Sequence, residues 1–177
     1  MTERFSVKLD KIDLEIIDLL QENARMKIGD IAAKVNKGIS TVHNRIKALE
    51  EAGVIKQYTA LIDGASVGRP TIAMVLITVR YRVPGRRDVI SQREFCKEIA
   101  EHPFVQSVHV LSGEFDVLLK VRTHDVEEMN RFIVDFLRQM PAVDRTLTMF
   151  VMDTYLDSNR IRLNAKIPKV KSAQSKQ

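Results

Sequence analysis

The 177-residue chain has one cysteine, Cys96, four histidines and no long run of apolar residues. One cysteine excludes an internal disulfide and a cysteine zinc site. The histidines are scattered, so we expect no metal site. Nothing in the sequence has the spacing of a nucleophile–base pair, a phosphate loop or a set of metal ligands, so we predict no enzyme, no catalytic residue and no cofactor. No segment approaches the roughly 20 apolar residues of a membrane helix, and the N-terminus lacks a signal peptide's apolar run. We therefore expect a cytoplasmic protein with no membrane partner.

Acidic residues are missing from the C-terminal end. The net charge of the chain is +5, but residues 1–63 hold 10 Lys+Arg and 10 Asp+Glu, and residues 64–157 hold 12 and 13. Residues 158–177 hold 6 and 0. The excess of positive charge is therefore a tail, which the sequence leaves open as a disordered solubilising end or as an arm that contacts DNA without sequence preference.

The segment from Ser40 to Gly53 organises the N-terminal half. Val42, Ile46 and Leu49 recur at helical spacing, while the opposite face is polar and basic. Another short helix is expected before it, from Ile28 to Val35, and a tight turn joins the two. Together they form a helix-turn-helix, whose second helix enters the major groove of DNA.

Charge supports a DNA-facing side. Residues 31–49 contain four cations and no acid, whereas a solvated helix pair normally mixes both signs. An earlier helix opens at Leu9, with Asp10 as its cap, and a strand pair or wing is expected over residues 54–62. The candidate DNA contacts are Lys37, Ser40, Thr41, His43, Asn44, Arg45, Lys47, Lys56 and Tyr58. Arg45 suits guanine and Asn44 suits adenine, while Lys47, Lys56 and Tyr58 suit phosphates.

Residues 64–70 contain two glycines and a proline, and we interpret them as a linker between two domains. After them the period of the pattern changes. The predicted elements are strand 71–83, helix 88–101, strands 104–111 and 115–123, helix 125–140 and strand 143–156. This β-α-β-β-α-β order predicts a ferredoxin-like domain over residues 71–157. The chain is then an α+β protein, with a DNA-binding domain at 1–63 and a basic tail at 158–177.

The predicted first and last strands are apolar on both faces. Two helices cover only one face of such a sheet, and a bare apolar face would aggregate. We therefore predict a homodimer through this domain, which also suits a helix-turn-helix that reads a two-fold operator.

Three motifs together resemble the Lrp/AsnC (feast/famine) family of transcriptional regulators. They are LDKIDLEIIDLLQ at 9–21, STVHNRIKALEEAGVIKQYTA at 40–60 and LSGEFDVLLKV at 111–121. The resemblance implies an N-terminal winged helix-turn-helix domain that binds double-stranded DNA. It also implies a C-terminal RAM/ACT-like domain that senses an amino acid, dimerises by its sheet and assembles dimers into tetramers or octamers. The turn between the two helices departs from the family's Gly-Leu-Ser: it is Asn36-Lys37-Gly38, which makes Gly38 the helix cap.

By the same resemblance, the effector binds where dimers meet. The matching positions are Val110, Gly113, Glu114, Phe115, Asp116, Val126, Met149, Phe150 and Val151. Glycine lets a ligand approach the backbone, and Asp116 suits an α-ammonium group. The residues alone favour the other interpretation, in which Gly113 is simply the hairpin glycine and Asp116 faces solvent, and the family resemblance reverses that preference.

Two alternatives stay open. One is an effector-independent architectural DNA-binding protein that uses the basic tail. The other is an enzyme regulated by the C-terminal domain, which no motif in the sequence supports. The main prediction is a sequence-specific regulator that responds to an amino acid through its DNA affinity or its assembly.

Overall fold

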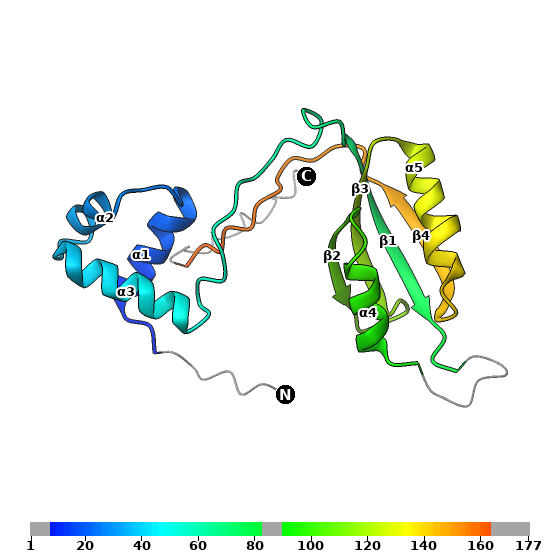
Figure 1. Cartoon of the computed structure of the whole chain (residues 1–177), viewed down its shortest axis with the longest axis horizontal. Helices are drawn as coiled ribbons and strands as arrows, with labels where there is room; N and C mark the ends of the chain where they lie inside the picture. The colour runs from blue at the N-terminus through cyan, green and yellow to red at the C-terminus, as the bar shows by residue number, and fades with distance from the viewer. Residues whose placement is uncertain (1–7, 83–89, 164–177) are drawn as a thin grey trace, which may run out of the picture. The chain divides into compact units, whose positions relative to one another are not determined.

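The computed structural model describes residues 8–82 and 90–163. The chain forms two compact units (Figure 1): residues 1–60 with 157–177 make the first, and residues 61–156 make the second. We call them the DNA-binding unit and the effector unit. The first boundary falls before the predicted linker, and the described start of the C-terminal segment, residues 157–163, belongs to the DNA-binding unit.

Three helices form the DNA-binding unit: α1 (Lys11–Glu22), α2 (Ile28–Lys34) and α3 (Ile39–Glu51). The predicted apolar faces meet in its core, where Ile16, Ile31 and Val42 are fully buried. Asp10 caps α1, as predicted, and forms a capping box with Asp13. The unit is thus a packed helix-turn-helix, with α2 and α3 joined by a four-residue turn.

The predicted strand pair after α3 is not formed, because no β-strand occurs between residues 54 and 62. Instead the segment is held to the end of α3. The N–H groups of Val54 and Ile55 both donate to the carbonyl of Leu49, and the Tyr58 hydroxyl donates to Glu50 at 2.8 Å. Gly53 has φ +68°, so it makes the left-handed turn that ends the helix.

The effector unit has one antiparallel four-stranded sheet in the order β2-β3-β1-β4. Its elements are β1 (Thr71–Val79), α4 (Gln92–Ala100), β2 (Val105–Val110), β3 (Val117–Thr123), α5 (Val126–Arg131) and β4 (Val143–Phe150). The helix of α5 continues as a π-turn over Phe132–Phe136 and a 3-10 turn over Leu137–Gln139. The predicted ferredoxin-like order is therefore confirmed.

Several predicted boundaries are too wide. Strand 143–156 ends at Phe150, and helix 88–101 begins only at Gln92. Strand 71–83 ends at Val79, and its last predicted residue, together with the start of the predicted helix, lies outside the described residues. Apolar composition marks these segments as strand-like, but only the residues with a partner strand can form the ladder.

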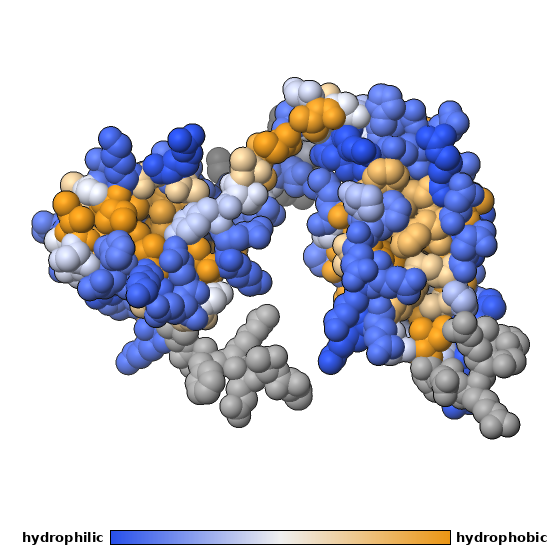
Figure 2. Space-filling model, in the orientation of Figure 1, coloured by the Kyte–Doolittle hydropathy of each residue, from blue (hydrophilic) through white to orange (hydrophobic). Residues whose placement is uncertain are grey.

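The two helices cover one face of the sheet (Figure 1). Ala73, Val75 and Ile77 of β1 are fully buried on that face, where they pack against residues of the helices. The alternate residues point to the other face, since side chains alternate along a strand. There Met74 pairs with Met149 and Leu76 pairs with Leu147. Met149 and Leu147 are about half exposed, at 45% and 44%. Figure 2 shows hydrophobic residues reaching the surface of both units between hydrophilic ones.

The predicted linker, residues 64–70, is a folded turn of the effector unit. Asp63 accepts hydrogen bonds from Ser66, and the N–H of Arg69 donates to the carbonyl of Gly64 at 2.7 Å. Arg122 of β3 donates to the carbonyl of Arg69 at 2.9 Å. Glycine and proline mark a turn here, but the turn is anchored rather than a hinge.

Candidate DNA interface and effector site

The outer face of α3 carries most of the predicted DNA contacts. Ser40, Thr41, His43, Asn44 and Lys47 are all exposed, while Val42, Ile46 and Leu49 hold the helix to the core. Gly38 caps the helix through its backbone, without a side-chain hydrogen bond. Lys37 is exposed in the turn before it. The arrangement presents short hydroxyl, amide and imidazole groups and cations together, which is a donor-rich surface suited to base edges and phosphates.

Arg45 is placed differently from its neighbours. Its Nη1 donates to Asp13 at 2.7 Å and to Asp10 at 2.8 Å, across the interface between α3 and α1. Its side chain is only 30% exposed. The two carboxylates raise the pKa of the Arg45 guanidinium, Asp13 first. This geometry argues against the predicted guanine contact, because the guanidinium is engaged in holding two helices together.

Two of the predicted phosphate contacts also have partners within the unit. Lys47 lies 3.7 Å from the carboxylate of Glu51, one helical turn on, which is a weak exposed pair. The Tyr58 hydroxyl donates to Glu50, and burial together with that carboxylate raises the pKa of Tyr58 to about 12. Tyr58 therefore stays a neutral donor. Lys56, in the segment after α3, is exposed.

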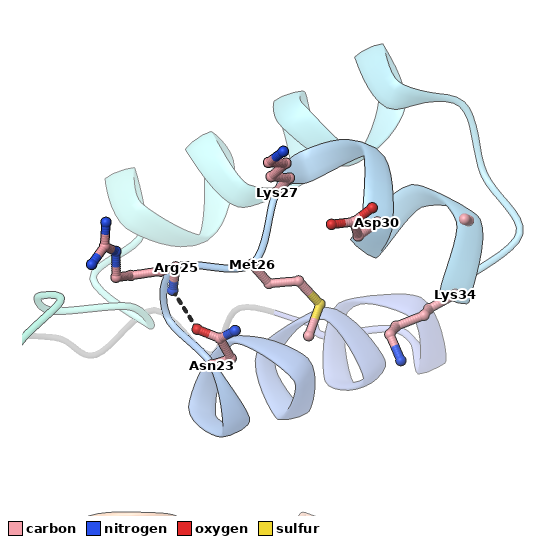
Figure 3. A pocket seen from close by; sticks show the side chains of 7 residues that line it. Asn23, Arg25, Met26, Lys27, Asp30 and Lys34 are labelled. Carbon is pink, nitrogen blue, oxygen red and sulfur yellow. Dashed lines mark hydrogen bonds between the residues drawn. The ribbon is translucent and has the colours of Figure 1, made fainter.

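A basic hollow that the sequence reading missed lies around the α1–α2 turn and α2. Figure 3 shows Arg25, Lys27 and Lys34 at its edge, with Asp30 as the one acidic group among its lining residues. The side chain of Asn23 accepts from the N–H of Arg25 at 2.9 Å and shapes the turn. Arg25 and Lys27 lie just before residues 31–49, whose excess of cations indicated a DNA-facing side. Counting the charges from residue 23 onward would have included them.

The predicted effector residues fall into two groups. The first is the turn from β2 to β3, with Val110, Gly113, Glu114, Phe115 and Asp116. Gly113 has φ +146° and no atom within 4 Å of an ideal Cβ, so the backbone there is open to approach. Arg145 of β4, which sequence reasoning missed, donates to Glu114 at 2.9 Å and lies over the Phe115 ring at 5.3 Å.

Asp116 holds the end of β1. One carboxylate oxygen accepts from the N–H of Val79 at 2.7 Å, and the other accepts from the hydroxyl of Tyr81 at 2.9 Å. Burial, and then Asp116, raise the pKa of Tyr81. The carboxylate is half-buried and bonded to two groups of the same unit, so it does not simply face solvent, which was one of the two interpretations of the sequence. An ammonium group there would share it with Val79 and Tyr81.

The second group lies at the opposite end of the sheet. Val126 begins α5, three residues after the last residue of β3. Met149 and Phe150 end β4 and Val151 follows it, beside the start of β1. The strand β3 separates this end from the turn by seven residues, or about 20 Å. One chain therefore does not bring all nine residues into one pocket.

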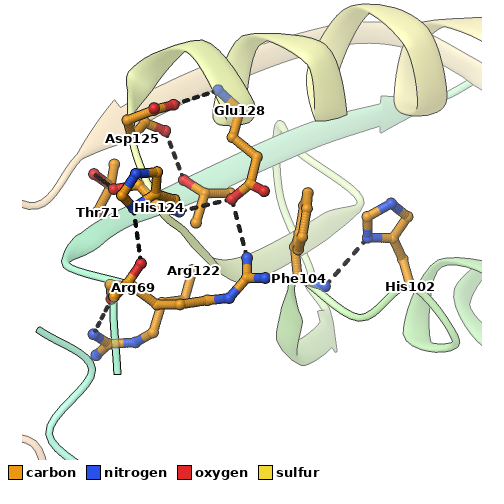
Figure 4. A network of polar contacts seen from close by, with 10 residues as sticks. Arg69, Thr71, His102, Phe104, Arg122, His124, Asp125 and Glu128 are labelled. Atoms are coloured by element: carbon orange, nitrogen blue, oxygen red, sulfur yellow. Dashed lines mark hydrogen bonds and ion pairs between the residues drawn. The ribbon is translucent and has the colours of Figure 1, made fainter. Parts of the chain in front are cut away.

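A polar network occupies the end of the sheet near Val126 (Figure 4). Glu128 accepts from Arg69 at 3.0 Å and from the N–H of His124 at 2.7 Å. Asp125 caps α5 by accepting from the N–H of Glu128 at 2.7 Å. Arg69 also lies 4.9 Å from the centre of the Phe104 ring. The bond between Arg69 and Glu128 fastens the 64–70 turn to α5. We therefore assign the network a structural role.

Among the described residues, no group of three or more His, Cys, Asp or Glu side chains has the arrangement of a metal site. Cys96 is half-buried in a groove between α4 and β2, where burial raises the pKa of its thiol. No helix within 8–82 and 90–163 is long and apolar enough to cross a membrane.

Both units match known domain families. Residues 9–56 match the model of winged helix-turn-helix DNA-binding domains, and residues 73–161 match the model of the Lrp/AsnC ligand binding domain. Together with the fold, these matches define a transcriptional regulator that combines a DNA-binding domain with a ligand-binding domain. The second match ends at residue 161, so the rest of the tail lies outside it.

Individual relatives agree with this class. A helix-turn-helix regulator of Pyrococcus abyssi is 38% identical over 146 residues, which are 82% of this chain and 94% of that protein. The leucine-responsive regulatory protein of Haemophilus influenzae is 33% identical over 159 residues, 90% of this chain and 93% of its own. A transcriptional regulator from Neisseria meningitidis in complex with L-Met has a TM-score of 0.79, with 29% identity over 88% of this chain and 97% of that one. The chain belongs to the Lrp/AsnC family of transcriptional regulators, which are not enzymes.

Proposed function

We propose that this regulator binds a specific operator through α3 and that an amino acid changes its DNA affinity or its assembly. The observation that carries the proposal is the pairing, in one chain, of an exposed polar recognition helix with an effector unit similar to that of a regulator solved with L-Met. A free amino acid offers a carboxylate to backbone N–H groups and an ammonium to a carboxylate, which the Gly113–Asp116 turn suits.

Assembly enters the proposal because the effector residues are divided. The turn group and the Val126 group lie at opposite ends of the sheet, so a pocket made from both needs more than one copy of the chain. The open sheet face, with Met74, Leu76, Leu147 and Met149, supplies an apolar surface for a homodimer. Further contacts between dimers, giving tetramers or octamers, then complete the pocket. A ligand that binds only the larger assembly favours it by linkage, typically by about 1–3 kcal/mol.

The experiment measures fluorescence anisotropy on DNA from upstream of the protein's own gene and on a scrambled duplex. Each of the twenty amino acids is added in turn, and light scattering follows particle size in the same samples. We expect the upstream duplex to bind more tightly than the scrambled one and one amino acid to shift affinity or size. If no amino acid changes either quantity, the effector part of the proposal is wrong.

The second candidate is an architectural DNA-binding protein that needs no effector. The contacts of Arg160 and Ile161, at the start of the basic C-terminal segment, with α1 of the DNA-binding unit favour it. Equal binding to both duplexes, with a steep salt dependence and no amino acid response, would support this candidate over the first.

A further inference from the structure

Arg145 places a cation beside the turn that joins β2 to β3. It lies on β4, and its Nη2 donates to the carboxylate of Glu114 at 2.9 Å. The guanidinium also lies over the Phe115 ring, with 5.3 Å between Cζ and the ring centre. Residues 111–116 of the turn contain no lysine or arginine. A residue 31 positions away in the sequence therefore supplies the turn with its positive charge.

The ion pair between Arg145 and Glu114 is easily opened. The two side chains are 59% and 74% exposed, and an ion pair so close to water contributes little to stability. Within residues 8–82 and 90–163, Nη2 is the one nitrogen of this guanidinium that donates a hydrogen bond. A guanidinium has five N–H donors and often binds a carboxylate through two of them. Glu114 therefore uses only part of the binding capacity of Arg145.

A hydroxyl without a partner lies across from Arg145. Thr78 is its partner in the register between β1 and β4, so the two side chains are cross-strand neighbours on one face of the sheet. The Oγ1 atom of Thr78 is buried and makes no hydrogen bond, the one such side-chain atom among the residues that the structure describes. Buried hydroxyl groups usually have a partner, because leaving one unpaired costs free energy. The surroundings of Arg145 thus have room for one more polar group.

We propose that Arg145 binds the α-carboxylate of the effector, and that Glu114 occupies the same guanidinium in the free protein. The inference rests on the proposed amino acid response and deepens it by assigning a charged partner to one end of the ligand. The ligand carboxylate displaces the Glu114 carboxylate, which swings into solvent. Two charge-assisted hydrogen bonds from the fork replace one, so the exchange favours the ligand.

The exchange defines the chemical class of the ligand. It must carry a free carboxylate, because a neutral amide group cannot compete with Glu114 for a cation. The ammonium end is left for Asp116. That carboxylate has about four lone-pair sites and uses two of them on Val79 and Tyr81, so it can accept one more donor. A free α-amino acid meets both requirements, and an amino acid amide meets only the second.

The test titrates the full-length protein with each of the twenty amino acids and with their primary amides, and calorimetry measures Kd. Arg145→Gln removes the positive charge and the fork, and Glu114→Gln removes the competing negative charge. Arg131→Gln is the matched control, since it breaks an ion pair with Glu127 in the same unit, at 3.1 Å and similarly exposed. Thermal unfolding shows that each variant is folded.

For an amino acid that binds, we expect Arg145→Gln to weaken binding about tenfold or more, as for the loss of a hydrogen bond between charged groups. Glu114→Gln should tighten binding about two- to fivefold, because an exposed competing pair is lost. The unchanged protein should prefer the amino acid to its amide by about tenfold or more, and Arg145→Gln should lose this preference. Arg131→Gln should behave like the unchanged protein.

An undiminished preference for the free carboxylate in Arg145→Gln would overturn the role of Arg145. Unchanged or weaker binding in Glu114→Gln would overturn the exchange. Either result leaves the proposed function standing, since an amino acid still binds. If no amino acid binds the unchanged protein, both the proposed amino acid response and this inference are wrong.

Discussion

Arg45 on α3 donates to the carboxylate of Asp13 on α1 at 2.7 Å, and Asp13 in turn accepts from the N–H of Asp10. The same two carboxylates, Asp10 and Asp13, therefore form the capping box of α1 and hold the recognition helix α3 to it through Arg45. The N–H of Asp13, and then Arg45, hold the pKa of Asp10 below its ordinary value. A cation on the recognition helix serves the fold here.

Arg45→Ala should destabilise the DNA-binding unit by about 1–2 kcal/mol, because charge-assisted hydrogen bonds to a partly buried carboxylate are lost. Urea unfolding followed by hydrogen exchange of α1 and α3 amides measures this. Lys47→Ala is the control, since its pair with Glu51 is exposed and longer. Equal stability of the two variants would show that Arg45 is not structural.

Asn44→Ala should leave stability unchanged and reduce the preference for the upstream duplex by about 1–3 kcal/mol, the usual cost of losing a bidentate base contact. Asn44 is exposed on α3 and makes no contact that holds the core. Anisotropy on both duplexes measures the preference. The matched control is Asn130→Ala, exposed on α5. A uniform loss on both duplexes would assign Asn44 to the phosphates instead.

Asp116→Ala should destabilise the effector unit by about 1–3 kcal/mol, since the N–H of Val79 is left without its acceptor. Tyr81→Phe removes only the hydroxyl bond and should cost about 1 kcal/mol or less. Thermal unfolding compares the two. If Asp116 also binds the effector, the amino acid response should disappear in Asp116→Ala and persist in Tyr81→Phe. Loss of the response in both variants would indicate that the turn geometry, and not the carboxylate, is what the ligand needs.

Stability of the effector unit should fall as pH drops below about 6.5. His102 packs against Phe104, Phe132 and Phe136, and burial lowers its pKa below the ordinary value of 6.5. The unfolded chain therefore takes up a proton first, so stability is fully present above pH 6.5 and declines toward the lower folded pKa.

The measurement for His102 is the urea midpoint between pH 8 and pH 5. The control is His102→Asn, whose side-chain oxygen can still accept from the N–H of Phe104, as Nδ1 does at 3.2 Å. It does not titrate, so its profile should be flatter. Identical profiles would assign the pH dependence to other groups.

Gly64→Ala should destabilise the effector unit by about 1–3 kcal/mol, because an added Cβ would collide with Nη1 of Arg122 and lie 2.7 Å from the carbonyl oxygen of Arg69. The arginine can move, but the backbone carbonyl can do so only by opening the turn. Gly29→Ala in α2 is the contrasting change, with an ordinary contact at 3.9 Å and an expected gain in helix propensity. Thermal unfolding that ranks the two variants equally would contradict the anchored turn.

Periodicity in the sequence was enough to predict the order of elements. Val42, Ile46 and Leu49 had to share a helix face, and β1 and β3 had to alternate, because a buried face imposes its period locally. The end of β4 at Phe150 was not predictable in the same way. The register that places Phe150 opposite Ala73 reaches the first residue of β1, Thr71, two positions later, so residues 153–156 have no partner on β1; Val151 still donates to the carbonyl of Ile72.

The sequence by itself determined the class of fold, the recognition helix and the family, since these depend on local patterns and on motifs in a fixed order. Only the tertiary structure decided what individual charges do. It paired Arg45 with α1, pinned Asp116 to Val79 and Tyr81, and docked Arg160 and Ile161 on α1 across about 140 residues of chain. A charged or amide side chain is compatible with water, DNA or a distant carboxylate alike, so its partner is set by which elements the packing brings within about 3 Å, and no local pattern records that.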